Sequence, residues 1–104
     1  MITIKVNFNK EGLITGYKVE GHAGLAEAGK DILCAAVSAI TQTPILGLER
    51  HLKRHPRCQV TEGTLKVELD KVDETTQTLL ATMLCGLQDL TEKYPENVRI
   101  EEQR

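Results

Sequence analysis

The sequence predicts an α+β fold, a two-layer α/β sandwich in which two helices cover one face of a mostly antiparallel sheet. Its length of 104 residues, 40% of them hydrophobic, suits a single domain over residues 1–104 with a two-layer core. The first stretch alternates apolar and polar residues, as a strand does, and two later stretches repeat apolar residues at the helical period. With the turn residues between them, these patterns give the element order ββαββαβ.

The first two strands have the most regular pattern. Residues 2–8 alternate strictly between apolar and polar side chains, which is the period of a half-buried strand. Residues 9–12 supply turn chemistry, and residues 13–20 continue as a second strand with Tyr17 and Val19 on one face. We therefore expect an antiparallel hairpin at the N-terminus.

A glycine-rich segment and a helix follow the hairpin. Residues 21–30 hold three of the eight glycines and little that could pack, so we expect a mobile loop. Asp31 is a favoured residue for capping the start of a helix, and apolar residues recur at helical spacing from Leu33 to Leu52. Pro44 lies inside this helix and should kink it, because proline removes one backbone hydrogen bond.

The last half of the chain repeats the pattern of two strands and a helix. Residues 57–60 and 64–69 predict a second hairpin around a glycine turn. The apolar repeat over residues 79–94 predicts a long amphipathic helix, which Pro95 should end. Residues 97–101 predict a short final strand, which completes the sheet.

The composition excludes several classes of function. Lys and Arg number 13 against 15 Asp and Glu, and only three residues are aromatic, so we expect no direct nucleic-acid binding. The longest unbroken apolar run, residues 32–37, is too short to span a bilayer, and we expect no membrane partner. The first nine residues lack the pattern of a signal peptide. These observations predict a cytoplasmic protein.

The three cysteines do not form a disulfide framework. Their number is odd, no pair has the Cys-x-x-Cys spacing, and a cytoplasmic location keeps thiols reduced. Cys58 and Cys85 are most simply interpreted as packing residues.

Cys34 has the setting that a reactive thiol requires. If Asp31 caps the helix, Cys34 is the third helical residue, where unpaired N–H groups and the positive end of the helix dipole favour a thiolate. His22 lies just past the second strand, where it could serve as a general base or as an ion-pair partner. Asp31 could also orient His22. From spacing alone, the alternative of a small buried cysteine and a surface histidine stays open.

Two motifs resemble those of a known family. Residues 16–24 read Gly-Tyr-Lys-Val-Glu-Gly-His-Ala-Gly, and residues 31–38 read Asp-Ile-Leu-Cys-Ala-Ala-Val-Ser. This combination resembles the ribosomal-processing cysteine protease family, Prp, and the similarity covers essentially the whole chain in length and element order. The resemblance implies a small homodimeric cysteine protease that needs no cofactor and has a two-layer α/β fold. Its implied substrate is the N-terminal extension of a large-subunit ribosomal protein, the twenty-seventh, cut just after aromatic residues.

The same resemblance implies roles for particular residues. Cys34 is the nucleophile and His22 is its partner, while Asp31 and Ser38 support them. The loop over residues 21–30 then closes over the substrate, and cleavage after aromatic residues implies an apolar pocket near the thiol. The loop residues in this role are Gly21, Ala23, Gly24 and Gly29.

A phosphate-binding loop is a weaker interpretation of the same glycine-rich segment. Residues 24–30 fit the Gly-x4-Gly-Lys part of that motif and precede a helix. Asp31 follows, however, where the motif needs a Ser or Thr hydroxyl for Mg²⁺, and its charge would face the phosphates. We therefore do not expect nucleotide hydrolysis.

A zinc site is a second alternative. His51, His55 and Cys58 could supply three N and S ligands. Residues 49–57 also contain four cations, which would repel a divalent metal, and Pro56 should end the helix near His55. These cations are Arg50, Lys53, Arg54 and Arg57. We expect no metal, and the default interpretation is a set of cations at a helix C-terminus.

The basic segment leaves one functional alternative, a noncatalytic ribosome-associated binding module. Such a module has no use for a thiolate at a helix start, so Cys34 separates the two hypotheses.

Overall fold

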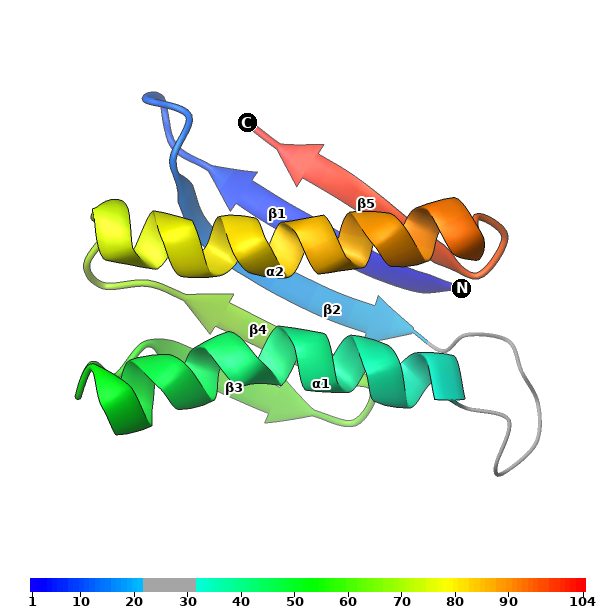
Figure 1. The fold of residues 1–104 in the computed structure, drawn as a ribbon, viewed down its shortest axis with the longest axis horizontal. Helices are drawn as coiled ribbons and strands as arrows, with labels where there is room; N and C mark the ends of the chain where they lie inside the picture. The colour runs from blue at the N-terminus through cyan, green and yellow to red at the C-terminus, as the bar shows by residue number, and fades with distance from the viewer. Residues whose placement is uncertain (22–31) are drawn as a thin grey trace.

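The computed structural model describes residues 1–21 and 32–104, and it has the predicted order of strands and helices (Figure 1). The elements are β1 (Ile2–Phe8), β2 (Ile14–Gly21), α1 (Ile32–Leu46), a π-helical turn η1 (Gly47–His51), β3 (Arg57–Thr61), β4 (Thr64–Glu68), α2 (Glu74–Lys93) and β5 (Val98–Gln103). The order ββαββαβ and the two-layer α+β class are confirmed, with η1 as an addition.

The five strands form one mixed sheet in the order β3-β4-β2-β1-β5. Every neighbouring pair is antiparallel except β1 with β5, which is parallel. Both helices lie on the same face of the sheet, and β3 and β5 are its opposite edges (Figure 1). The prediction of a mostly antiparallel sheet under two helices is therefore correct.

The core lies between the sheet and the helices. Ile4 and Val6 of β1 are completely buried, because the alternation of that strand turns every second side chain toward the helices. Val37 of α1, together with Leu80 of α2, closes the core from above. Burial of each such side chain contributes about 1.5–3 kcal/mol, and this packing sets the position of α1 on the sheet.

The opposite face of the sheet is polar, and its charges pair with one another. Glu20 of β2 binds Lys5 at 3.0 Å and Lys18 at 3.3 Å. Arg57 of β3 binds Glu68 of β4 at 3.2 Å. These residues alternate along their strands with side chains that are on the helix-covered face of the sheet.

The first long helix ends differently from the prediction. We expected helical spacing to Leu52, but the α-helix ends at Leu46, two residues after the buried Pro44, and continues as the π turn η1. Proline donates no backbone hydrogen bond, so it weakens the α-helical pattern around it. The segment then stops at Lys53, whose φ of 56° is left-handed, while the Arg54 N–H donates to the Leu48 carbonyl at 2.8 Å.

The second helix begins at Glu74, before the apolar repeat from which we predicted it. Asp73 caps it: the Asp73 carboxylate accepts from the Thr76 N–H at 3.0 Å, and the Thr76 hydroxyl accepts from the Asp73 N–H at 3.0 Å. Arg54 also binds the Asp73 carboxylate, at 2.9 Å, and so ties the end of η1 to the start of α2.

One stretch in the described residues, Ile32–His51, is long and apolar enough to cross a membrane by length and composition alone. The sequence argument from unbroken apolar runs is therefore too strict for this stretch. The core helix of a two-layer protein meets the same criterion, and Leu33, Val37 and Ile45 are buried in the core beneath the helices.

Candidate functional site

Cys34 is the third residue of α1, in the first turn of the helix. Leu33 and Val37 on either side of it are buried in the core, and this packing fixes the rotation of α1 about its axis. Cys34 is therefore half-buried, with one side against the core and the other on a groove. Ser38 and Thr41 lie one and two turns further along and line the same groove, since residues four and seven apart share a helix face.

The groove lies between α1, the end of β2 and the β3–β4 hairpin, and has a volume of about 260 Å³. Its apolar side chains come from the sheet, and its polar side chains come largely from α1 and the hairpin turn. The lining residues are Val19, Gly21, Cys34, Ser38, Thr41, Gln42, Val60, Thr61, Gly63, Thr64 and Leu65. The groove thus combines an apolar surface with several polar groups, as ligand-binding sites generally do.

A buried tyrosine holds α1 in place beneath the groove. The Tyr17 hydroxyl of β2 donates to the Thr41 carbonyl of α1 at 2.6 Å, and the Tyr17 side chain is completely buried. Burial raises the pKa of Tyr17 well above its usual value, so the hydroxyl keeps its proton for this hydrogen bond. The Thr41 hydroxyl in turn donates to the Val37 carbonyl at 2.8 Å. The wall of the groove that carries Cys34 is thus anchored to the sheet.

Gly21 ends β2 at the rim of the groove. Its φ is 92°, and a side chain at this position would collide with the Met1 carbonyl oxygen, so only glycine fits. The Gly21 N–H donates to the Gly63 carbonyl at 3.3 Å, which joins the end of β2 to the turn of the β3–β4 hairpin.

Three of the predicted site residues come together in this groove: Gly21, Cys34 and Ser38. The others lie outside the described residues, as do the expected loop and the phosphate-loop motif. They are His22, Ala23, Gly24, Gly29 and Asp31. The geometry between Cys34 and His22 thus stays a prediction.

Several residues of the groove were not predicted from the sequence. Thr41 and Gln42 follow Cys34 by seven and eight positions, so helical periodicity from the candidate nucleophile could have found them. Val60, Thr61 and Leu65 come from the β3–β4 hairpin, and no local pattern connects that hairpin with Cys34.

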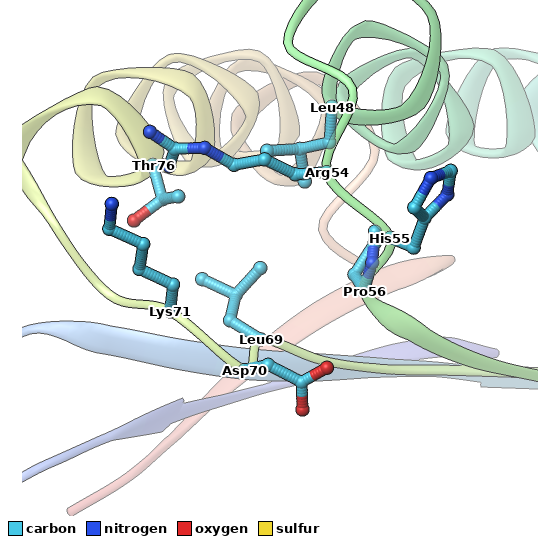
Figure 2. A pocket seen from close by; sticks show the side chains of 8 residues that line it. All are labelled: Leu48, Arg54, His55, Pro56, Leu69, Asp70, Lys71 and Thr76. Atoms are coloured by element: carbon cyan, nitrogen blue, oxygen red, sulfur yellow. The ribbon is translucent and has the colours of Figure 1, made fainter.

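A second pocket, of about 210 Å³, lies where η1, the β4–α2 connection and the start of α2 meet (Figure 2). Arg54 extends toward Thr76 on one side, with Lys71 below it, and His55 comes from the segment before β3 (Figure 2). Asp73 already binds Arg54 at 2.9 Å and Lys71 at 3.8 Å. The charges around this pocket are therefore largely satisfied.

The zinc alternative receives no support here. Within residues 1–21 and 32–104, no three His, Cys, Asp or Glu side chains gather in a group that could hold a metal ion. Cys58 lies on β3 opposite Val67 of β4, so its side chain is on the helix-covered face. Cys58 is exposed overall, but partial desolvation of its thiol raises the pKa of Cys58, with a smaller contribution from Glu49, and this does not favour a thiolate there.

Comparisons with known proteins agree with the fold. The family model of the cysteine protease Prp matches residues 1–99. The ribosomal processing cysteine protease Prp of Staphylococcus aureus strain Mu50 is 32% identical over 103 residues, which cover 96% of this chain and 97% of that protein. The protein of the same name from Mycoplasma genitalium is 30% identical over 104 residues, which cover 96% of each chain.

Solved structures are similar over nearly the whole chain. The S. aureus protease Prp in complex with a substrate peptide superposes with a TM-score of 0.88 at 29% identity, covering 99% of this chain and 100% of that one. The structure of SMU.848 from Streptococcus mutans gives a TM-score of 0.85 at 31% identity, covering 99% and 97%.

The fold, the groove beside a thiol in the first turn of a helix, and these similarities together define a cysteine protease. The chain belongs to the ribosomal-processing cysteine protease family Prp.

Proposed function

We propose that this protease removes the N-terminal extension of a large-subunit ribosomal protein, the twenty-seventh, with Cys34 as its nucleophile and His22 as general base and acid. The observation that carries the proposal is the position of Cys34. It lies in the first turn of α1, at the positive end of the helix dipole, and it lines the groove between the helix and the sheet. The S. aureus relative is a ribosomal processing protease solved with a substrate peptide, which supports a substrate of this class.

The reaction then proceeds in two steps. The Cys34 sulfur bonds to the carbonyl carbon of the scissile peptide bond, the carbon–nitrogen bond breaks, and protonated His22 gives its proton to the departing amine. Water next attacks the thioester, loses a proton to His22, and releases the new carboxyl end with the Cys34 thiolate restored. Backbone N–H groups at the start of α1 are the proposed donors to the oxyanion.

The remaining predicted residues have supporting roles in this proposal. Ser38 follows Cys34 by one turn and lies in the same groove. Asp31 would cap α1 and orient His22. The loop residues Gly21, Ala23, Gly24 and Gly29 would close over the peptide. The apolar lining that Val19, Val60 and Leu65 provide suits an aromatic side chain next to the cut.

The first test is cleavage of the extension peptide. A synthetic peptide that spans the N-terminal extension and the mature start of that ribosomal protein, from the same organism, is incubated with the wild type and with Cys34→Ala. Mass spectrometry should show cleavage after an aromatic residue by the wild type only, because Cys34→Ala has no nucleophile.

His22→Ala should lose most of the turnover in the same assay. Cys85→Ala is the matched control, since Cys85 lies on α2 outside the groove, and it should cleave like the wild type. Full activity in Cys34→Ala would contradict the proposed mechanism. A wild type that leaves this peptide intact but cleaves another would contradict the proposed substrate.

A further inference from the structure

The two edges of the sheet differ in a way that bears on how a peptide would bind. The edge strand β5 carries charges that pair within the strand and just after it: Arg99 binds Glu101 at 3.1 Å, and Arg104 binds Glu102 at 3.1 Å. Charged side chains of this kind prevent another strand from pairing with an edge. β5 is also the edge furthest from the groove.

The other edge, β3, lacks this protection near the groove. Only Arg57, its first residue, is charged, and Arg57 is held by Glu68 and Asp70. The next four residues, 58–61, are Cys-Gln-Val-Thr, and all five residues of the strand are exposed. The pairing of β3 with β4 is regular, without a bulge. At residues 58–61 the edge therefore presents a regularly paired stretch of backbone without charged side chains.

Half of the backbone groups on this stretch have no partner within the sheet. In an antiparallel pair, every second residue directs its N–H and C=O away from its neighbour strand. Among the described residues β4 is the only strand beside β3, so the outward groups of β3 lie on a free edge. They can receive the backbone of an extended chain.

The free edge leads into the groove of Cys34. Val60 and Thr61, the last two residues of β3, line that groove together with Cys34 and Ser38. Val60 is paired with Leu65, a residue that packs against the core, so its side chain lies on the helix-covered face of the sheet. Val60 is nevertheless 77% exposed, which leaves an apolar surface beside the thiol for another side chain to cover.

We propose that the substrate peptide binds as an additional strand on the free edge of β3. Its alternate side chains would enter the groove against Val60, and the others would point to the polar face of the sheet. Main-chain hydrogen bonds then supply affinity for any extended segment, while the groove selects the side chain next to the cut. The proposal deepens the proposed protease function and rests on it for the identity of the peptide.

A scan of N-methylated substrate peptides tests this arrangement. Each backbone nitrogen of the extension peptide, except that of the scissile bond, is methylated in turn, and kcat/KM is measured with the wild type. Because only every second amide of an added strand bonds to β3, kcat/KM should fall about tenfold at alternate positions and stay near the parent value between them. Losses without this alternation, or no losses, would overturn the proposal.

A pair of variants tests the apolar contact. Val60→Ser removes apolar surface from the groove and should raise KM about fivefold while kcat changes little. Leu46→Ser is the control, because Leu46 is also an exposed apolar residue but lies at the far end of α1, outside the groove. An equal effect of both variants would count against the proposed contact.

A binding measurement that needs no catalysis separates this proposal from the proposed function. Amide hydrogen exchange is followed in Cys34→Ala with and without the parent peptide. Protection of residues 58–61 supports strand addition even when the wild type does not cleave the peptide, in which case only the proposed function fails. Cleavage without protection at β3 overturns strand addition and leaves the function intact. Protection that rises with protein concentration instead of peptide identifies a second copy of this chain as the occupant, and the proposal fails.

Discussion

Individual residues hold the elements around the groove in place, through one hydrogen bond in the case of Tyr17 and through one backbone angle in the case of Gly21. Tyr17 is the clearest case, since a completely buried phenol donates to a carbonyl of the helix that carries Cys34. The ring fills space in the core and the hydroxyl connects two layers, so the residue combines packing with orientation.

Tyr17→Phe separates these two contributions. The substitution keeps the ring but removes the hydrogen bond to the Thr41 carbonyl, so the free energy of unfolding in urea should fall by about 1 kcal/mol. Tyr94→Phe is the control, because Tyr94 is half exposed beyond the end of α2 and should unfold like the wild type. An unchanged Tyr17→Phe would show that ring packing alone holds α1.

Lys53 illustrates local strain. Its φ of 56° lies in the left-handed region, which glycine adopts readily. In lysine, steric repulsion involving the Cβ makes this conformation less favourable. Lys53→Gly should therefore raise the free energy of unfolding by about 0.5–1 kcal/mol, measured by urea titration. Lys53→Ala keeps the Cβ and should change little. An equal stabilisation of Lys53→Gly and Lys53→Ala would show that loss of the lysine charge, and not relief of backbone strain, raises the free energy of unfolding.

At the scale of elements, the cap of α2 is a charged junction. Asp73 caps the helix and binds Arg54 from the segment after η1. The hydrogen bond from Arg54, followed by that from the Thr76 N–H, lowers the pKa of the Asp73 carboxyl below its ordinary value of 3.8. A carboxyl with a lowered pKa in the folded state stabilises the fold above its unfolded pKa and loses that contribution as the pH falls through its folded pKa.

Asp73→Asn tests this linkage while keeping a good capping side chain. At neutral pH the variant should unfold at lower urea than the wild type, because the charge that binds Arg54 is gone. As the pH falls below about 3.8, the wild-type carboxyl takes up a proton and the two urea midpoints should converge. If the urea midpoints of the wild type and Asp73→Asn still differ at the lowest pH, the effect comes from the capping geometry of the side chain and not from its charge.

At the scale of the molecule, the open sheet face bears on assembly. The family resemblance implies a homodimer, and the helices leave one face of the sheet uncovered (Figure 1). The homodimer and the cytoplasmic location remain proposals. The charges on that face pair among themselves, so we expect a dimer contact formed there to be polar.

Sedimentation equilibrium tests the homodimer directly. A dimer should give about twice the chain mass of 11.5 kDa. If the contact involves the paired charges, dissociation should increase with salt, because salt screens exposed charges. A monomer at all concentrations would contradict the proposal.

Local patterns predicted most of the fold. In β1 and α2, the side chains that face the core recur along the sequence with the period of a strand or of a helix. The alternation in β1 and the apolar repeat in α2 follow from this recurrence. The same reasoning placed Cys34 in the first turn of a helix, because capping and dipole effects act within a few residues. Local patterns did not predict where α1 ends, which depends on Pro44, or where α2 begins, which depends on the Asp73 cap.

The groove was beyond this reasoning, because it belongs to no single element. Val60 and Cys34 are 26 positions apart and meet only because α1 packs over the hairpin that carries Val60. The edge position of β3 likewise depends on which strands pair, through contacts between distant segments. Periodicity along the chain predicted the helix that carries Cys34, and the position of Cys34 near a capping residue made it the candidate nucleophile. Only the packing of helix on sheet decided what surrounds the thiol, because long-range contacts leave no repeat in the sequence.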